Sequence, residues 1–219
     1  MSAELVVVPT GTANTASVVA AFGRLGVRAQ LDPTADAVRE AERVVLPGVG
    51  AFGAAARRLA ALGLRDALVE RVTAGRPTLA ICLGMQLFCE TSEESTGVPG
   101  LGLVRCAAER FRTELSVPHL GWNTVEPVAP AGSSTAPRIL EAGEAYFAHT
   151  YRLAGLPAGW AGATTTYARP FVSALERGAV LACQFHPEIS GAWGGRLLAR
   201  WLEAEPVTRA SAENGGPSC

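Results

Sequence analysis

Hydrophobic residues in the first half of the chain fall into short apolar runs that alternate with segments of helical spacing. The apolar runs predict buried strands at residues 5–8, 27–31, 44–46 and 78–81. The segments between them repeat apolar positions every three to four residues, which predicts helices at residues 16–25, 54–62 and 64–74. Strands that alternate with helices through short loops indicate a mostly parallel central sheet with helices on both faces.

The pattern changes from about Gly97 onward. Short apolar strands separated by glycine and proline turns are predicted at residues 101–106, 121–125, 145–149, 162–167, 171–175 and 180–185, and a last helix at 195–202. The sequence therefore predicts an α/β fold with additional antiparallel strands in the C-terminal half. Residues 1–204 are expected to form one domain, and residues 205–219, which have little to bury, a disordered tail.

Composition narrows the class of protein. The 219 residues are 48% hydrophobic and 18% charged, with a net charge of −1 and no block of like charges, so neither nucleic acid nor an anionic membrane surface is an expected partner. No basic segment precedes an apolar one at the N-terminus, and no apolar run could span a bilayer. The cysteines are scattered and form no C-x-x-C pair, which indicates a reducing cytoplasm rather than a disulfide framework or a zinc site; they are Cys82, Cys89, Cys106, Cys183 and Cys219.

The segment T-L-A-I-C-L-G-M-Q places Cys82 where the strand at 78–81 should pass into a helix. Such a turn exposes a nucleophile above the sheet, and the next backbone N–H, that of Leu83, can face a developing oxyanion. Gly84 provides the small residue that a tight turn needs. A lone cysteine at a strand end is more often a packing residue, so this segment alone leaves both interpretations open. Cys89, two turns into the predicted helix, is expected in the core.

A second segment, L-A-C-Q-F-H-P-E-I-S, places His186 and Glu188 two residues apart at the end of an apolar strand. In extended geometry both side chains point the same way. A nucleophilic cysteine needs a base, and the base needs an acceptor that orients it. A surface histidine beside an acid at a helix start is an equally good interpretation of this segment alone. Cys183 is expected in the core.

A third segment, L-P-G-V-G-A-F-G, is unusually rich in glycine after a strand. Its Gly48–Val49–Gly50 part can present backbone N–H groups to an anionic centre, although a plain strand-to-helix turn explains it equally well. No Gly-Lys-Ser/Thr follows, so it is not a P-loop. His119 and His149 have no second ligand at metal-binding spacing, and no metal site or cofactor is predicted.

Taken together, the segments resemble the class I (triad) glutamine amidotransferases, and most closely the glutaminase subunits of imidazole glycerol phosphate synthase in histidine biosynthesis. These subunits carry P-G-V-G-A-F, G-I-C-L-G-M-Q, H-M-G-W-N, Y-F-V-H-S-Y and Q-F-H-P-E-K-S in this order. The corresponding segments here are P-G-V-G-A-F, A-I-C-L-G-M-Q, H-L-G-W-N, Y-F-A-H-T-Y and Q-F-H-P-E-I-S. The resemblance extends from about Leu5 to Leu202.

The resemblance implies roles for individual residues. Cys82 would be the nucleophile, His186 the base and then the acid, and Glu188 the residue that orients the histidine. The Leu83 amide and an amide of the Gly48–Val49–Gly50 loop would bind the oxyanion, and Gln86 would contact L-glutamine. The partner would be a cyclase subunit of (β/α)₈ type, bound as a heterodimer, and the face that meets it would include Gly11, Asn14, His119, Trp122, Asn123 and Tyr146.

The sequence also departs from the family pattern. Pro9 and Thr10 replace an Asp-Tyr pair in the first loop, which affects the expected interface but not the hydrolytic chemistry. Ala80 replaces a glycine, which would strain the turn if that position needed a positive φ. Ile189 replaces a lysine after the acid. The alternatives to the histidine pathway are a glutaminase for another synthase, such as pyridoxal phosphate synthase, and a non-catalytic partner protein with the same fold.

Overall fold

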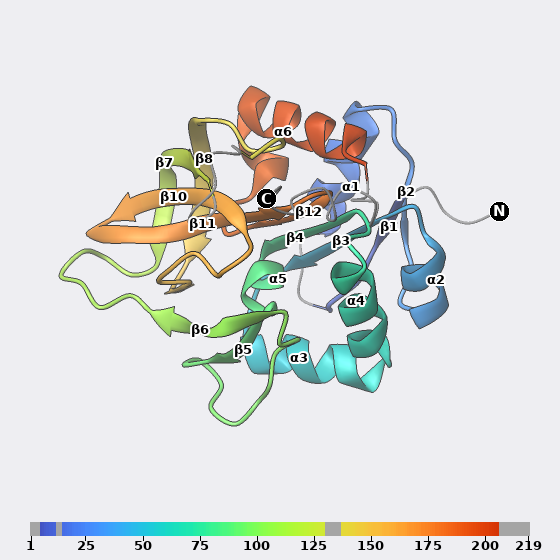
Figure 1. The fold of residues 1–219 in the computed structure, drawn as a ribbon, viewed down its shortest axis with the longest axis horizontal. Helices are drawn as coiled ribbons and strands as arrows, with labels where there is room; N and C mark the ends of the chain where they lie inside the picture. Colours follow the sequence, from blue (N-terminus) through green and yellow to red (C-terminus); the bar gives the residue numbers. More distant parts are fainter. Residues whose placement is uncertain (1–4, 12–14, 130–136, 206–219) are drawn as a thin grey trace, which may run out of the picture.

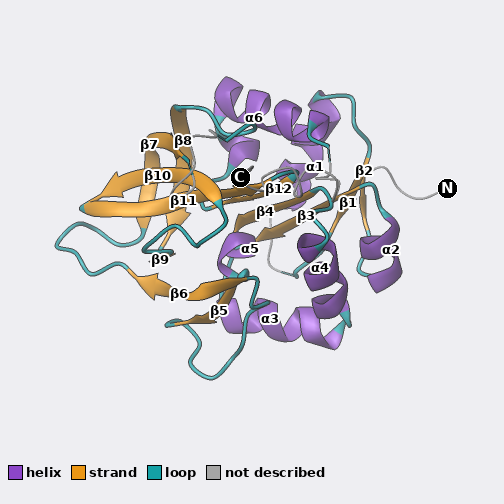
Figure 2. Cartoon of the chain, in the orientation of Figure 1, coloured by secondary structure: helices purple, strands orange, loops and turns teal. Residues whose placement is uncertain are grey.

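The computed structural model describes residues 5–11, 15–129 and 137–205. Five parallel strands form one half of a central sheet: β2 (Ala29–Leu31), β1 (Leu5–Val7), β3 (Arg43–Gly48), β4 (Thr78–Cys82) and β12 (Val180–Cys183). Four antiparallel strands continue the sheet beyond β12: β11 (Arg169–Arg177), β10 (Ala161–Tyr167), β7 (His119–Val128) and β8 (Gly143–His149). The expected mostly parallel sheet with antiparallel strands in the C-terminal half is confirmed (Figures 1 and 2).

Helices cover both faces of the parallel strands. One face carries α1 (Thr15–Arg24) and α6 (Gly191–Glu203), which lie together at the top of Figure 1. The opposite face carries α2 (Ala35–Glu40), α3 (Phe52–Ala61) and α4 (Leu64–Thr73). The remaining elements are α5 (Leu83–Gln86), the 3₁₀ turn η1 (Pro187–Ile189), and a small sheet of β5 (Cys89–Ser92), β6 (Val104–Arg110) and β9 (Tyr151–Arg152).

Strand alternation divides the core into two layers. In β1, Leu5 and Val7 pack with α1 and α6, whereas Val6 packs on the opposite side with α3 and α4. All three side chains are essentially inaccessible to solvent. Each such side chain stabilises the fold by about 1.5–3 kcal/mol relative to an exposed one. Burial on both faces explains why the central strands read as continuous apolar runs.

The segment after Cys82 corrects one expectation. The helix that begins at Leu83 ends at Gln86, and Cys89 begins β5 instead of lying in the helix. Cys89 is buried as expected, but it packs in the small sheet, with its Sγ 3.2 Å from the Sγ of Cys106. Cys183 lies buried in β12, as expected.

Four elements had no counterpart among the sequence predictions: α2, β5, β9 and η1. Helix α2 buries only Val38, so it creates no apolar period, and it is stabilised at its start by Thr34, whose Oγ1 accepts from the Ala37 N–H at 3.3 Å. Strand β2 is shorter than predicted and begins at Ala29. Residues 206–219 of the predicted disordered tail lie outside the described residues. No helix in the described parts of the chain is both long and apolar enough to cross a membrane.

Candidate active site

Cys82 lies at a strained turn between β4 and α5. Its backbone has φ 54° and ψ −106°, a conformation that costs a non-glycine residue about 1–3 kcal/mol. Packing maintains the turn: a Cβ at Gly84 would lie 2.1 Å from the carbonyl oxygen of Leu46, so only glycine allows α5 to approach β3 this closely. The turn has the geometry of a nucleophile elbow, which directs the thiol away from the strand.

Ala80 causes no strain at this turn. It lies in the middle of β4, paired with Leu46 of β3 on one side and Ala182 of β12 on the other. The described non-glycine residues with positive φ are Cys82 and Ala168, so position 80 has no need of glycine for its backbone conformation. The left-handed residue of the elbow is the nucleophile itself.

His186 and Glu188 meet across a turn rather than along a strand. Strand β12 ends at Cys183, and η1 folds the chain so that Glu188 Oε1 lies 2.9 Å from His186 Nδ1. The hydroxyl of Ser190 donates to the His186 carbonyl at 2.6 Å and accepts from the Tyr146 N–H at 3.0 Å, which holds this turn against β8. The bond at Nδ1 leaves Nε2 of the imidazole to face Cys82.

The surroundings of His186 favour its protonated form. Burial by itself lowers the pKa of His186, but the neighbouring Cys82 thiol and the Glu188 carboxylate outweigh it and raise the pKa to about 10. A proton is therefore held on the imidazole at neutral pH. An imidazolium beside Cys82 can give a proton to a leaving group bound in the same pocket.

A pocket of about 360 Å³ opens above Cys82. This volume falls in the range of about 300–1,000 Å³ that is typical of small-molecule sites. The pocket brings together the residues that sequence analysis assigned to catalysis, oxyanion binding and substrate contact, namely Cys82, His186, Val49, Gly50, Leu83 and Gln86. Gly48 lies beside it, since Gly48 pairs with Cys82 where β3 and β4 end.

Six lining residues were absent from the predicted catalytic and substrate-binding set, namely Glu94, Pro118, Ala148, His149, Thr150 and Tyr151. Glu94 comes from the loop after β5, and its Oε2 accepts from the Phe52 N–H at the start of α3 at 2.5 Å. His149 ends β8, Tyr151 begins β9, and together with Thr150 between them they form another wall. The segment Y-F-A-H-T-Y had signalled the latter three, but as part of a partner face; nothing in the sequence around Glu94 signals a site.

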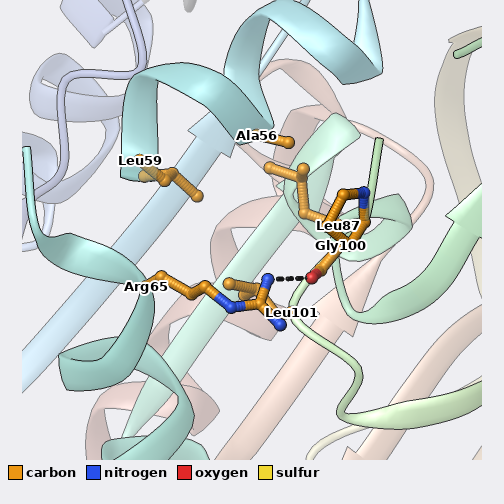
Figure 3. Close-up of a pocket in the computed structure, with 7 residues that line it drawn as sticks. Ala56, Leu59, Arg65, Leu87, Gly100 and Leu101 are labelled. Atoms are coloured by element: carbon orange, nitrogen blue, oxygen red, sulfur yellow. Dashed lines mark hydrogen bonds between the residues drawn. The ribbon is translucent and has the colours of Figure 1, made fainter. Parts of the chain in front are cut away.

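A second cavity, shown in Figure 3, is not an alternative substrate site. It lies between α3 and the segment that leads into β6, and its volume of about 10 Å³ has room for roughly one water molecule. Leu59, Leu87 and Leu101 line it, and the Arg65 guanidinium donates to the Gly100 carbonyl across it. Among the described residues, no cluster of three or more His, Cys, Asp or Glu could hold a metal ion.

The residues expected at a partner face have different exposures. Trp122 and Tyr146 pair across β7 and β8 with their rings 6.1 Å apart, and Trp122 is 56% exposed. Asn123 is partly buried and Gly11 is exposed, whereas Asn14 lies outside the described residues.

His119 requires a correction, because its side chain is only 3% exposed. It stacks between Phe147 and Tyr167, at ring-centroid distances of 4.7 and 4.1 Å, and therefore supports the face from beneath.

Thr10, one of the departures from the family pattern in the first loop, donates to the Pro47 carbonyl at 3.2 Å and so attaches this loop to the glycine-rich loop.

Comparison with known proteins places this geometry in a family. The sequence profile described as glutamine amidotransferase class-I matches residues 6–203. The HisH subunit of imidazole glycerol phosphate synthase from Symbiobacterium thermophilum is 42% identical over 203 residues, covering 91% of this chain and 93% of that subunit. The subunit of the same name from Herpetosiphon aurantiacus is 41% identical over 179 residues, covering 81% of this chain and 84% of its own length.

Solved structures agree on the fold. A crystal structure of a glutamine amidotransferase superposes with a TM-score of 0.72 at 20% identity, covering 91% of this chain and 97% of the other. PurLQS from Thermotoga maritima superposes with a TM-score of 0.63 at 15% identity, covering 93% and 98%. The chain therefore belongs to the class I glutamine amidotransferase family and, within it, to the family of HisH subunits of imidazole glycerol phosphate synthase.

Proposed function

We propose that this chain is the glutaminase subunit of an imidazole glycerol phosphate synthase and that it hydrolyses L-glutamine with Cys82, His186 and Glu188. The observation that carries the proposal is the meeting of Cys82 and His186 in one pocket, with Glu188 bonded to the far nitrogen of the imidazole. These groups come from the carboxyl ends of neighbouring parallel strands, β4 and β12. The set supplies a nucleophile, a proton carrier and an orienting acceptor, which acyl transfer requires.

In the first half-reaction the Cys82 thiolate attacks the side-chain amide carbon of glutamine. The developing oxyanion is bound by the Leu83 N–H, which begins α5 and therefore has no acceptor within that helix, together with an N–H of the Val49–Gly50 segment. The protonated His186 gives its Nε2 proton to the leaving nitrogen. Ammonia departs and a thioester joins Cys82 to the glutamyl group.

In the second half-reaction the now neutral His186 takes a proton from water, which attacks the thioester carbon. The tetrahedral intermediate collapses, the carbon–sulfur bond breaks, and glutamate leaves with the thiolate restored. Glu188 Oε1 accepts from the Nδ1–H of His186 and holds the ring in place, so that Nε2 is the nitrogen that exchanges protons.

Two further pocket residues suit the α-amino acid part of glutamine. The Glu94 carboxylate is held by the Phe52 N–H and lines the pocket, where we assign it to the substrate's ammonium group. Gln86 is 4% exposed and contributes an amide to the same pocket. Neither residue takes part in proton transfer, so both act on substrate binding.

The ammonia product passes to a cyclase subunit, which we propose to be a (β/α)₈ barrel bound as a heterodimer. The cyclase would use the ammonia to convert a phosphoribulosyl formimino aminoimidazole carboxamide ribonucleotide into imidazole glycerol phosphate and aminoimidazole carboxamide ribonucleotide. We place the contact on the face of β7 and β8 that exposes Trp122, with Asn123, Tyr146 and the first loop at Gly11. A cytoplasmic location follows from this biosynthetic role.

The test is glutamate release by the purified chain with its cyclase and the ribonucleotide substrate. Cys82→Ala should lower the rate at least about a thousandfold, because removing a nucleophile from such a catalytic unit abolishes most of the acceleration. Cys106→Ala is the matched control: Cys106 lies on β6 outside the pocket lining, and its loss should leave the rate within about twofold.

Each other outcome rejects a defined part of the proposal. Glutamate release at the wild-type rate by Cys82→Ala would reject the assigned nucleophile. Activation by a different synthase, but not by the cyclase, would reject the partner. Absence of glutaminase activity in the wild-type complex would favour a non-catalytic partner protein.

A further inference from the structure

Gln184 lies next to the nucleophile without belonging to the Cys-His-Glu set. It follows directly after β12, two residues before His186, and its side chain is completely buried. Its backbone N–H donates to the Ser173 carbonyl at 2.9 Å, which continues the pairing with β11. Its side-chain Nε2 lies 3.6 Å from the Sγ of Cys82, within hydrogen-bonding distance of a sulfur acceptor.

Neighbouring bonds determine which end of the Gln184 amide faces the sulfur. Gln86 Nε2 lies 3.1 Å from the Tyr151 carbonyl oxygen and 3.2 Å from Gln184 Oε1. A backbone carbonyl only accepts, so the Gln86 atom that meets it must be the NH₂ group. The same group has a second hydrogen for Gln184, whose oxygen must therefore face Gln86. The Gln184 NH₂ is then directed at Cys82.

The Tyr151 carbonyl, which determines how the Gln86 amide is oriented, also accepts from a second chain of hydrogen bonds. His149 Nδ1 lies 2.8 Å from it and must donate, so His149 Nε2 accepts from His119 Nδ1 at 3.0 Å. His119 Nε2 then accepts from Asn123 Nδ2 at 3.2 Å. Burial lowers the pKa of His149 to about 3 and that of His119 to about 4, so both rings are neutral at pH 7, as this order of donors requires.

The two protonation states of Cys82 meet different partners. A thiol has an acceptor in the Ala148 carbonyl, at a long 3.9 Å. A thiolate has no hydrogen to give and instead accepts from Gln184. Unlike His186, the amide does not titrate, so it still faces the sulfur after the imidazole has given its proton to the leaving nitrogen. A donor of this kind stabilises the sulfur each time negative charge returns to it.

We propose that Gln184 is a positioning residue for the reaction: its Nε2–H holds the Cys82 sulfur in the attacking rotamer and stabilises the thiolate, and Gln86 orients its amide. The proposal rests on the assigned role of Cys82 as nucleophile. It also gives Gln86 a second role, because a residue of the substrate pocket then determines how the donor to the sulfur is oriented.

The test measures the Cys82 thiolate directly and needs neither glutamine nor a cyclase. The rate of alkylation of Cys82 by iodoacetamide is measured from pH 5 to pH 10 in the full-length chain, and the modified cysteine is located by mass spectrometry. Gln184→Met retains the length of the side chain and removes the donor. Gln30→Met, at an exposed glutamine on β2, is the matched control.

Gln184→Met should shift the midpoint of the alkylation profile upward by about one pH unit, which lowers the rate about tenfold below the midpoint. The rate on the high-pH plateau should stay within about twofold of wild type. Gln30→Met should leave the whole profile unchanged. If the midpoint of folded Gln184→Met did not move, whether or not the plateau rate fell, the proposal would be overturned, because a packing role alone produces that result.

Gln86→Met covers the case in which Gln184→Met does not fold. It leaves Gln184 in place but releases its amide, so the midpoint should move in the same direction by a smaller amount. A wild-type profile for folded Gln86→Met would overturn the orienting role. Because alkylation does not depend on glutamine hydrolysis, a failure of the proposed function would appear in the glutamate assay and leave this profile readable.

Discussion

Two adjacent glycines of α6, Gly194 and Gly195, differ sharply in the space that a methyl group would find. A Cβ at Gly194 would lie 2.1 Å from the Pro187 carbonyl oxygen and 2.9 Å from Ser190 Cβ, whereas a Cβ at Gly195 would meet no atom within 4 Å. In Gly194→Ala the carbonyl would have to withdraw by more than about 1 Å to reach an ordinary contact distance. Pro187 begins the turn that carries Glu188, so the methyl group would displace the acid of the triad.

The two variants should therefore change stability in opposite directions. Gly194→Ala should lower the free energy of unfolding by about 1–3 kcal/mol, the usual effect of overpacking. Gly195→Ala should raise it by roughly 0.5–1 kcal/mol, because alanine is the better helix former and the site is open. A displacement of about 1 Å at Glu188 should also lower glutaminase turnover by up to about a hundredfold.

Urea unfolding followed by circular dichroism gives the first quantity, and glutamate release with the cyclase present gives the second. The comparison is internal, since both variants add the same methyl group to neighbouring positions of one helix. If Gly194→Ala were as stable and as active as Gly195→Ala, the turn at 187–189 would not depend on its packing against α6, and the argument would fail.

Two more predictions concern buried cationic and titratable groups. Arg71 is 2% exposed and donates to the carbonyls of Val38, Ala41, Glu42 and Pro77. Arg71→Met leaves these four carbonyls without their donor and should lower the free energy of unfolding, measured in urea, by at least about 3 kcal/mol. A decrease of less than about 1 kcal/mol would contradict the assigned role. For His149, burial lowers the pKa from 6.5 to about 3, so the unfolded chain binds more protons below pH 6.5 and stability falls as the pH drops through this range. Between pH 7.5 and 5.5 this histidine should account for about 1 kcal/mol of the lost unfolding free energy. His149→Gln should remove this contribution, because glutamine keeps a donor and an acceptor but does not titrate. If the unfolding free energy of this variant depended on pH as in the wild type, the ring would not be held neutral.

The layered fold and the catalytic segments could be predicted from the sequence because their signals are local. Apolar runs such as residues 78–81 are buried on both faces of the sheet, so each predicts a strand without knowledge of its neighbours. The segments that contain Cys82 and His186 each combine a reactive residue with the end of a strand, and together they resemble one family. Helix α2 escaped prediction because its single buried residue, Val38, leaves no period to detect.

Other features of the site were decided only by the tertiary structure. Glu94 reaches the pocket because its loop folds back onto the start of α3, and His119 is buried because Phe147 and Tyr167 enclose its ring. Gln184 is directed at the sulfur of Cys82 because Gln86 orients its amide. Residue types and their order along the chain determined which groups could carry the chemistry. Their contacts depend on packing and on hydrogen-bond direction between segments far apart in the sequence, which no local pattern encodes.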